Sequence, residues 1–103
     1  MYRGTTPCLK LTLDTDLDLS TVKQLWVTLK NISVEITKTE ADVDINSADK
    51  YIIVTLTQKE TLSIIAGKVS VQVRLLLDDG RAFATNVKQV VVNDILKGGV
   101  LGE

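Results

Sequence analysis

The sequence predicts an all-β protein: an antiparallel, immunoglobulin-like β-sandwich of about seven strands with one short helical turn. Val, Ile and Thr, which favour strands, make up about a third of the 103 residues. Apolar side chains recur at every second position in most segments, as in strands that are buried on one face. The spacing of alternating strands and helices is absent, so a sandwich is preferred and a small barrel is the alternative.

The first half of the chain contains the shorter predicted strands. Apolar and polar side chains alternate over residues 9–13, 24–30, 32–36, 43–45 and 51–56. Asp18 or Ser20 is expected to cap a turn that leads into the second strand. The polar residues 46–50 have the composition of a turn, which separates the fourth strand from the fifth.

One helical turn is expected after the fifth strand. Thr57 and Glu60 have the spacing of a capping box, in which each side chain hydrogen-bonds the backbone of the other residue. The apolar contacts of this turn are expected from Leu62, Ile64 and Ile65. Gly67 ends it, and the longest strand follows over residues 68–77.

The Asp-Gly step in Asp78-Asp79-Gly80 predicts a hairpin. We prefer a three-residue loop with Gly80 left-handed over a two-residue loop, which would leave core positions opposite polar or small residues. The preferred loop predicts the register Leu75 with Phe83, Val73 with Thr85 and Val71 with Val87. Beyond residue 87 the alternation is lost, which predicts a bulge or a strand buried on both faces.

The chain is expected to form a single domain over residues 1–103, with an apolar C-terminal tail from about residue 93. Pro7 is the only proline, and no linker composition divides the chain. The first residues lack the apolar run of a signal peptide, and no segment has the length of a membrane span. The Cys…Trp…Cys spacing of antibody domains is also absent.

The composition argues against most enzymes and against nucleic acid as a partner. The chain has no histidine, the commonest general base, and its one cysteine, Cys8, has no imidazole partner. Twelve basic residues against 13 acidic residues leave no positive excess to bind phosphates. We therefore expect a non-enzymatic protein with no cofactor and no catalytic residues. Cys8 is expected to be half-buried.

Two acidic patterns are better explained as solvated turns than as a metal site or a catalytic pair. Asp14, Asp16 and Asp18 alternate as at the start of a calcium loop, but the glycine and the glutamate of such a loop are replaced by Leu19 and Leu25. No metal site is therefore predicted. Asp78 and Asp79 belong to a solvated turn, so neither is expected to have the raised pKa of a general acid.

Several apolar residues stand where the strand pattern predicts polar ones. They are either a second core beneath the helical turn and the termini, which is slightly favoured, or an exposed interface. The tail is easier to explain by docking onto another chain than by packing on its own domain. The candidate interface residues are Trp26, Tyr51, Ile53, Leu76, Ile95, Leu96, Val100 and Leu101.

Segments along nearly the whole chain resemble small prophage-encoded proteins of Gram-positive bacteria. These segments are residues 1–7, 36–39, 54–62, 67–74, 79–80 and 91–100. The order of strand, LT-x-x-E-T, Gly, strand, Asp-Gly and strand is also distantly similar to the immunoglobulin-like N-terminal domain of phage baseplate upper proteins.

The resemblance implies a structural or accessory component of a tailed phage that binds itself or other phage structural proteins. It implies the host cytoplasm during assembly, and the virion, as locations. The charge balance and the lack of a membrane-spanning segment predict that neither nucleic acid nor a membrane is a partner. No catalytic or ligand-binding residue follows from the resemblance. The alternative is a β-sandwich module that binds a small ligand or a carbohydrate, with Trp26 or Tyr51 as a stacking platform.

Overall fold

A computed structural model describes residues 1–13 and 17–102. The described part is mostly β-structure, as the sequence predicts. Its strands are β1 (Cys8–Thr12), β2 (Val22–Lys30), β3 (Glu35–Thr39), β4 (Val43–Asn46), β5 (Tyr51–Thr55), β6 (Gly67–Leu77), β7 (Ala82–Ala84) and β8 (Lys88–Val92). A 3-10 turn, η1 (Leu19–Thr21), precedes β2, and a helix, α1 (Gln58–Leu62), lies between β5 and β6.

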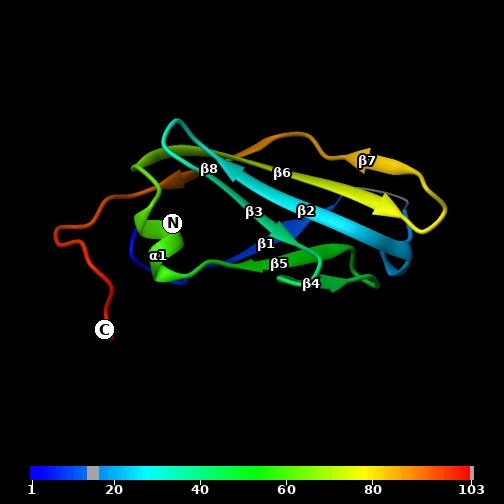
Figure 1. Cartoon of the computed structure of the whole chain (residues 1–103), viewed down its shortest axis with the longest axis horizontal. Coiled ribbons are helices and arrows are strands. Elements are labelled where there is room, and N and C mark those ends of the chain that lie inside the picture. The colour runs from blue at the N-terminus through cyan, green and yellow to red at the C-terminus, as the bar shows by residue number, and fades with distance from the viewer. Residues whose placement is uncertain (14–16, 103) are drawn as a thin grey trace.

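The strands form two antiparallel sheets that face each other (Figure 1). The small sheet has the order β1-β5-β4. The large sheet has the order β3-β2-β6-β7, and β8 pairs with β6 beyond the end of β7. Both α1 and the chain termini lie at one end of the sandwich, and the β6–β7 hairpin lies at the other (Figure 1).

The core consists of the alternate side chains that each sheet turns toward the other. The inward residues of β2, β5 and β6 are almost fully buried, because each of these strands has a neighbour on both sides and a sheet opposite. Representative core residues are Val27, Val54 and Val73, which are at most 2% exposed. Burial of this apolar face is the main stabilising contribution in such a fold.

The third strand lies three residues later than the sequence pattern indicated. Asn31 begins a turn, because its side-chain oxygen accepts hydrogen bonds from the backbone of Ser33 and Val34. The strand therefore starts at Glu35, and Ile32, which was expected in the strand, is 97% exposed in the turn. Local side-chain hydrogen bonds of asparagine compete with strand pairing in this way.

The β6–β7 hairpin confirms the three-residue loop. Leu77 N–H donates to the carbonyl of Arg81, Gly80 has φ +89°, and Leu75 pairs with Phe83. The predicted pair of Val71 with Val87 is wrong, because Val71 pairs with Lys88. One extra residue therefore enters between β7 and β8.

The strand that was predicted to follow the hairpin is thus divided, and its last part is a separate strand, β8. One face of β8 is exposed. Val92 is buried and Val90 is half-buried, whereas Val91 is 56% exposed. The alternative of a strand buried on both faces is therefore wrong, and the irregularity lies before Lys88 rather than within the valine run.

The capping box of α1 is confirmed. Glu60 N–H donates to Thr57 Oγ1 at 3.1 Å, and Thr57 N–H donates to Glu60 Oε1 at 2.9 Å. Ile64 is buried beyond the helix, but Ile65, which was expected to pack, is 54% exposed. The 3-10 turn before β2 is capped by Asp18, whose carboxylate accepts from Ser20 N–H at 3.0 Å.

The N-terminal residues add to the edge of the large sheet beside β8. Tyr2 forms a parallel bridge with Asn93. Asn93 N–H donates to the Met1 carbonyl at 2.6 Å, and Arg3 N–H donates to the Asn93 carbonyl at 3.0 Å. Residues 1–3 therefore close the side of the sandwich between β1 and β8 at the α1 end.

Candidate interaction site

The residues predicted to form an interface lie on three separate surfaces. Trp26 and Leu76 point outward from the large sheet, and Tyr51 and Ile53 point outward from the small sheet. The remaining four are in the tail, which leaves the sandwich at the α1 end (Figure 1). A single flat partner cannot cover all three surfaces.

The outer patch of the large sheet consists of Trp26, Leu76 and Ala82 with the polar residues Gln24 and Arg74. Trp26 is 41% exposed, and the Arg74 guanidinium lies 5.6 Å from the centre of its ring. These five residues line a shallow hollow of about 200 Å³ near the β6–β7 hairpin. The patch is apolar at the tryptophan and carries a cation at its border.

The outer face of the small sheet is more polar. Lys10 Nζ lies 4.4 Å from the centre of the Tyr51 ring, which is an attractive cation–π contact. Ile53 is paired with Lys10 on one side and with Asp44 on the other. Ile53 is half-buried, and both of its cross-strand neighbours are charged. This face offers little apolar area to a partner.

The tail contacts its own domain at several points, including an ion pair between Asp94 and Arg3 at 2.9 Å. Ile95 and Leu62 both approach Gly4, since a Cβ at Gly4 would lie 3.1 Å from the Ile95 side chain and 3.3 Å from that of Leu62. Leu101 N–H donates to Gln58 Oε1 at 2.7 Å, and Gln58 Nε2 donates back to the Leu101 carbonyl. Val100 is half-buried, but Leu96 and Leu101 expose their side chains. Their apolar side chains are available to another chain.

A cavity that the sequence did not indicate lies between the two sheets. It has a volume of about 300 Å³ and opens on the side where the edge strand β1 faces β7 and β8. Its wall is mostly apolar and includes Leu11 and Leu13 from the small sheet and Val71, Val73 and Phe83 from the large sheet. We call it the inter-sheet cavity.

Lys88 stands at this cavity in a position that apolar residues occupy elsewhere in β8. It lies two residues before Val90 and four before Val92, so its side chain belongs to the inward row of the strand. Lys88 is exposed, and no carboxylate in residues 1–13 and 17–102 forms an ion pair with it. The lysine in phase with two valines is the sequence signal that could have indicated the cavity.

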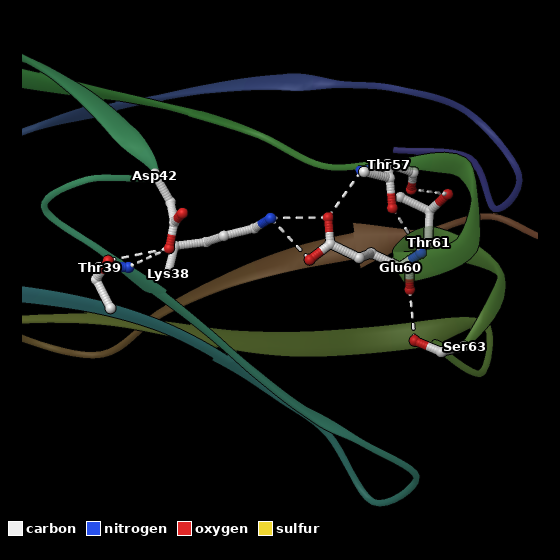
Figure 2. A network of polar contacts seen from close by, with 7 residues as sticks. All are labelled: Lys38, Thr39, Asp42, Thr57, Glu60, Thr61 and Ser63. Atoms are coloured by element: carbon white, nitrogen blue, oxygen red, sulfur yellow. Dashed lines mark hydrogen bonds and ion pairs between the residues drawn. The ribbon is translucent and has the colours of Figure 1, made fainter.

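The most extensive polar cluster joins β3 to α1 (Figure 2). Lys38 Nζ contacts both carboxylate oxygens of Glu60, at 2.8 and 2.7 Å, and the same carboxylate completes the capping box with Thr57. The Thr61 hydroxyl is buried and donates to the Thr5 carbonyl at 2.8 Å. Every polar group drawn has a partner, so the cluster holds α1 in place and leaves no group free to react.

Hydrogen bonds within the fold lower the pKa of several carboxyl groups. Burial raises the pKa of Glu60, but hydrogen bonds from Lys38 and Thr57 outweigh it and keep that pKa below its usual range. Hydrogen bonds from Ser20 lower the pKa of Asp18, and hydrogen bonds from Arg81 lower the pKa of Asp79. A general acid needs a raised pKa, so none of these three groups is suited to that role.

Two sequence candidates remain: Cys8 and the calcium-like pattern of Asp14, Asp16 and Asp18. Cys8 is exposed, not half-buried, and lies 3.4 Å from the Thr55 hydroxyl. Asp14 and Asp16 of the calcium-like pattern lie outside the described residues. Among the described residues, no group of three or more acidic or cysteine side chains could hold a metal ion.

Comparisons of the chain with protein-family models, with curated proteins and with solved structures found no match. In residues 1–13 and 17–102, no helix has the length and apolar character needed to span a membrane.

Proposed function

We propose that this protein is a non-enzymatic interaction module of a tailed phage, a structural or accessory component that acts by binding phage structural proteins. The observation that carries the proposal is the apolar hollow at the hairpin end, which is lined by the exposed Trp26, the half-buried Leu76 and the partly exposed Phe83. Exposed apolar surface bordered by polar residues is typical of protein interfaces. The resemblance of the chain to prophage proteins gives the proposed context.

The strand order supports an immunoglobulin-like identity for the sandwich. The small sheet β1-β5-β4 corresponds to strands B, E and D of that fold, and β3-β2-β6-β8 corresponds to C′, C, F and G. The parallel bridge of Tyr2 to Asn93 places residues 1–3 beside the last strand. Domains of this architecture commonly serve as binding modules, although a fold alone does not assign a function.

The composition and the lowered pKa values of the described carboxyl groups favour a non-enzymatic role. The chain contains no histidine, and in residues 1–13 and 17–102 each carboxyl group with a shifted pKa has it lowered. Such groups remain charged at neutral pH and make hydrogen bonds within the fold. They cannot donate protons to a substrate there.

The proposal is tested on particles purified from an induced lysogen of the host. Quantitative mass spectrometry is expected to find the chain in particles, or in assembly intermediates, in a constant ratio to a tail or capsid protein. A chain carrying Trp26→Ser is expected to be incorporated less than one carrying Ile32→Ser, which removes an exposed apolar residue at the end of the sandwich away from the hairpin. Absence of the chain from both particles and intermediates would overturn the proposal.

Light scattering on a sizing column separates self-association from binding to other proteins. The full chain is compared with a truncation that ends at Asn93. A closed oligomer that becomes a monomer on truncation would identify the tail, with its exposed Leu96 and Leu101, as the contact between copies. A monomer in both cases would assign the interaction to another phage protein.

Carbohydrate binding is the second candidate function. The hollow beside Trp26 favours it, because an exposed indole ring with Gln24 and Arg74 nearby combines a stacking surface with hydrogen-bond donors. A glycan array tests this role. Binding that is lost in Trp26→Ala and kept in Ile32→Ala would support it, and the absence of binding on the array would dispose of it.

A further inference from the structure

We propose that the open side of the sandwich binds an extended strand of a partner protein, which pairs with the free edge of β1 and inserts apolar side chains into the inter-sheet cavity. The strand carries an acidic residue that meets Lys88. This inference rests on the proposed function, since it specifies how an interaction module of this kind would engage its partner. Addition of a strand to an exposed sheet edge is a common mode of peptide recognition.

The hydrogen-bonding pattern of β1 leaves one edge open. Leu56 N–H donates to the Pro7 carbonyl and Leu13 N–H donates to the Lys50 carbonyl, so the odd-numbered residues 7–13 face β5. The backbone groups of Cys8, Lys10 and Thr12 therefore point away from β5. No strand among the described residues pairs with them. Such an edge is a template for another strand.

The opposite side of the opening is also incomplete. Between β7 and β8, Thr85 N–H donates to the Val73 carbonyl, and its hydroxyl accepts from Val73 N–H at 3.1 Å. Gln72 Nε2 donates to the Thr85 carbonyl at 2.9 Å. These bonds hold the interruption of the sheet edge in a defined form, so the gap is a built feature of the fold.

The cavity between these edges suits alternate side chains of an inserted strand. Leu11 and Leu13 form one wall, and Val71 and Val73 form the other. A strand that lies along β1 turns every second side chain toward the space between the sheets. A volume of about 300 Å³ accommodates a few aliphatic side chains, which would complete the core at this end.

Charge and pairing geometry distinguish the partner from a second copy of this chain. Lys88 has no ion-pair partner among the described residues, so a carboxylate on the inserted strand would form an ion pair with it. In the antiparallel β1 dimer with the longest overlap, Lys10 would lie opposite Lys10 of the other copy. Like charges placed directly opposite each other destabilise such a pair.

The α1 end shows that this side of the sandwich accepts an added strand. Residues 1–3 pair with β8 through the Tyr2–Asn93 bridge and cover the opening there. At the hairpin end, no described segment takes the corresponding place. Residues 1–3 cover the side of the sandwich at the α1 end, and the proposed partner strand would cover the same side at the hairpin end.

The test is a selection from a library of nine-residue peptides, displayed on yeast, against the full chain. Enriched peptides are expected to alternate apolar residues and to carry Asp or Glu. Their binding is expected to slow amide hydrogen exchange at residues 8, 10 and 12, which point to the open edge, and not at residues 9 and 11, which already bond to β5. Fast exchange at residues 8, 10 and 12 is expected in the free protein.

A matched pair of variants tests the backbone pairing. Lys10→Pro removes an N–H that points away from β5, whereas Lys10→Ala removes the same side chain and keeps the N–H. The affinity for the enriched peptide is expected to be about tenfold lower in Lys10→Pro than in Lys10→Ala. N-methylation of the peptide on the edge facing β1 is expected to give the same loss, even if Lys10→Pro fails to fold.

A second pair tests the charge. Lys88→Glu is expected to weaken binding of acidic peptides about tenfold. Lys68→Glu, on the outer face at the start of β6, is expected to change it less than about twofold, because its charge is remote from the cavity.

Three results would overturn the inference: no enriched peptide, equal binding to Lys10→Pro and Lys10→Ala, or protected amides at residues 8, 10 and 12 in the free monomer. Binding of dodecanoate in place of peptide would assign the cavity to an anionic amphiphile and would overturn it as well. If the chain is absent from particles but binds peptides as described, the phage proposal alone fails. If Lys10→Pro folds and assembles into particles normally, the strand inference alone fails.

Discussion

The two ends of the sandwich differ in how the space between the sheets is filled. At the α1 end, Ile64 and Thr61 are buried, the Lys38–Glu60 pair ties α1 to β3, and residues 1–3 close the side next to β8. At the hairpin end, the inward side chains of β1 and β6 border a cavity of about 300 Å³, and the edge of the large sheet is interrupted between β7 and β8.

This difference separates an end that contributes to stability from an end where we propose that a partner binds. A closed end gains apolar burial and satisfied hydrogen bonds, and both stabilise the fold. An open apolar cavity lacks part of this stabilisation. Such a cavity is therefore expected where a partner supplies the missing contacts. The following predictions either sharpen this comparison or break it.

The largest expected effect is in the core. Leu56→Ala at the closed end is expected to lower the free energy of unfolding by about 4 kcal/mol, because Leu56 is fully buried and its neighbours cannot collapse onto the space left. Leu75→Ala is expected to lower it by about 2 kcal/mol, because Leu75 already borders the cavity. Urea denaturation of both variants measures the difference, and equal losses would contradict the comparison.

The Lys38–Glu60 pair gives the next effect. Its side chains are only 15% and 25% exposed, so Glu60→Gln, which also weakens the capping box, is expected to cost about 1 to 2 kcal/mol. Glu35→Gln, at an exposed glutamate of β3, the strand that contains Lys38, serves as the control. If the free energy of unfolding falls no more in Glu60→Gln than in the control, the Lys38–Glu60 pair does not stabilise the closed end.

The same carboxylate predicts a pH dependence. The folded protein holds the pKa of Glu60 below its ordinary value. The contribution of Glu60 to stability is therefore fully present at pH values above the ordinary pKa of glutamate, about 4.3. It is lost as the pH falls through the lowered folded-state pKa. Urea denaturation from pH 7 to pH 3 is expected to give a smaller loss of stability in Glu60→Gln than in the unchanged chain. Parallel curves would contradict this.

The hairpin loop at the open end predicts a smaller effect. Gly80 has φ +89° and open space around it, so Gly80→Ala is expected to cost about 1 kcal/mol through backbone strain alone. Gly98→Ala, where the backbone is not in the left-handed region, is expected to leave stability unchanged. Thermal unfolding of the two variants provides the measurement.

The smallest change is expected at Lys88. Lys88→Val restores the apolar inward row of β8 and is expected to leave stability unchanged or to raise it by about 0.5 kcal/mol. A loss of more than about 1 kcal/mol would mean that Lys88 has a structural role in the free protein and is not reserved for a partner.

The sequence by itself determined the all-β class, most strand positions, the capping box of α1 and the three-residue hairpin. Each depends on local rules: alternation of side chains along a strand, reciprocal hydrogen bonds between Thr57 and Glu60, and the left-handed conformation of Gly80. These rules involve residues close in sequence. The sequence also singled out Trp26 and Leu76, whose apolar side chains stand in the outward row of their strands.

Only the tertiary structure decided how the outward residues are distributed and where the sandwich stays open. Trp26 and Tyr51 lie on opposite outer faces because β2 and β5 belong to different sheets, which no local pattern reveals. The inter-sheet cavity exists because β1 and β8 are edge strands of facing sheets, about 80 residues apart in the chain. Pairing between such distant segments depends on the whole arrangement of strands, so its consequences appear only when the fold is complete.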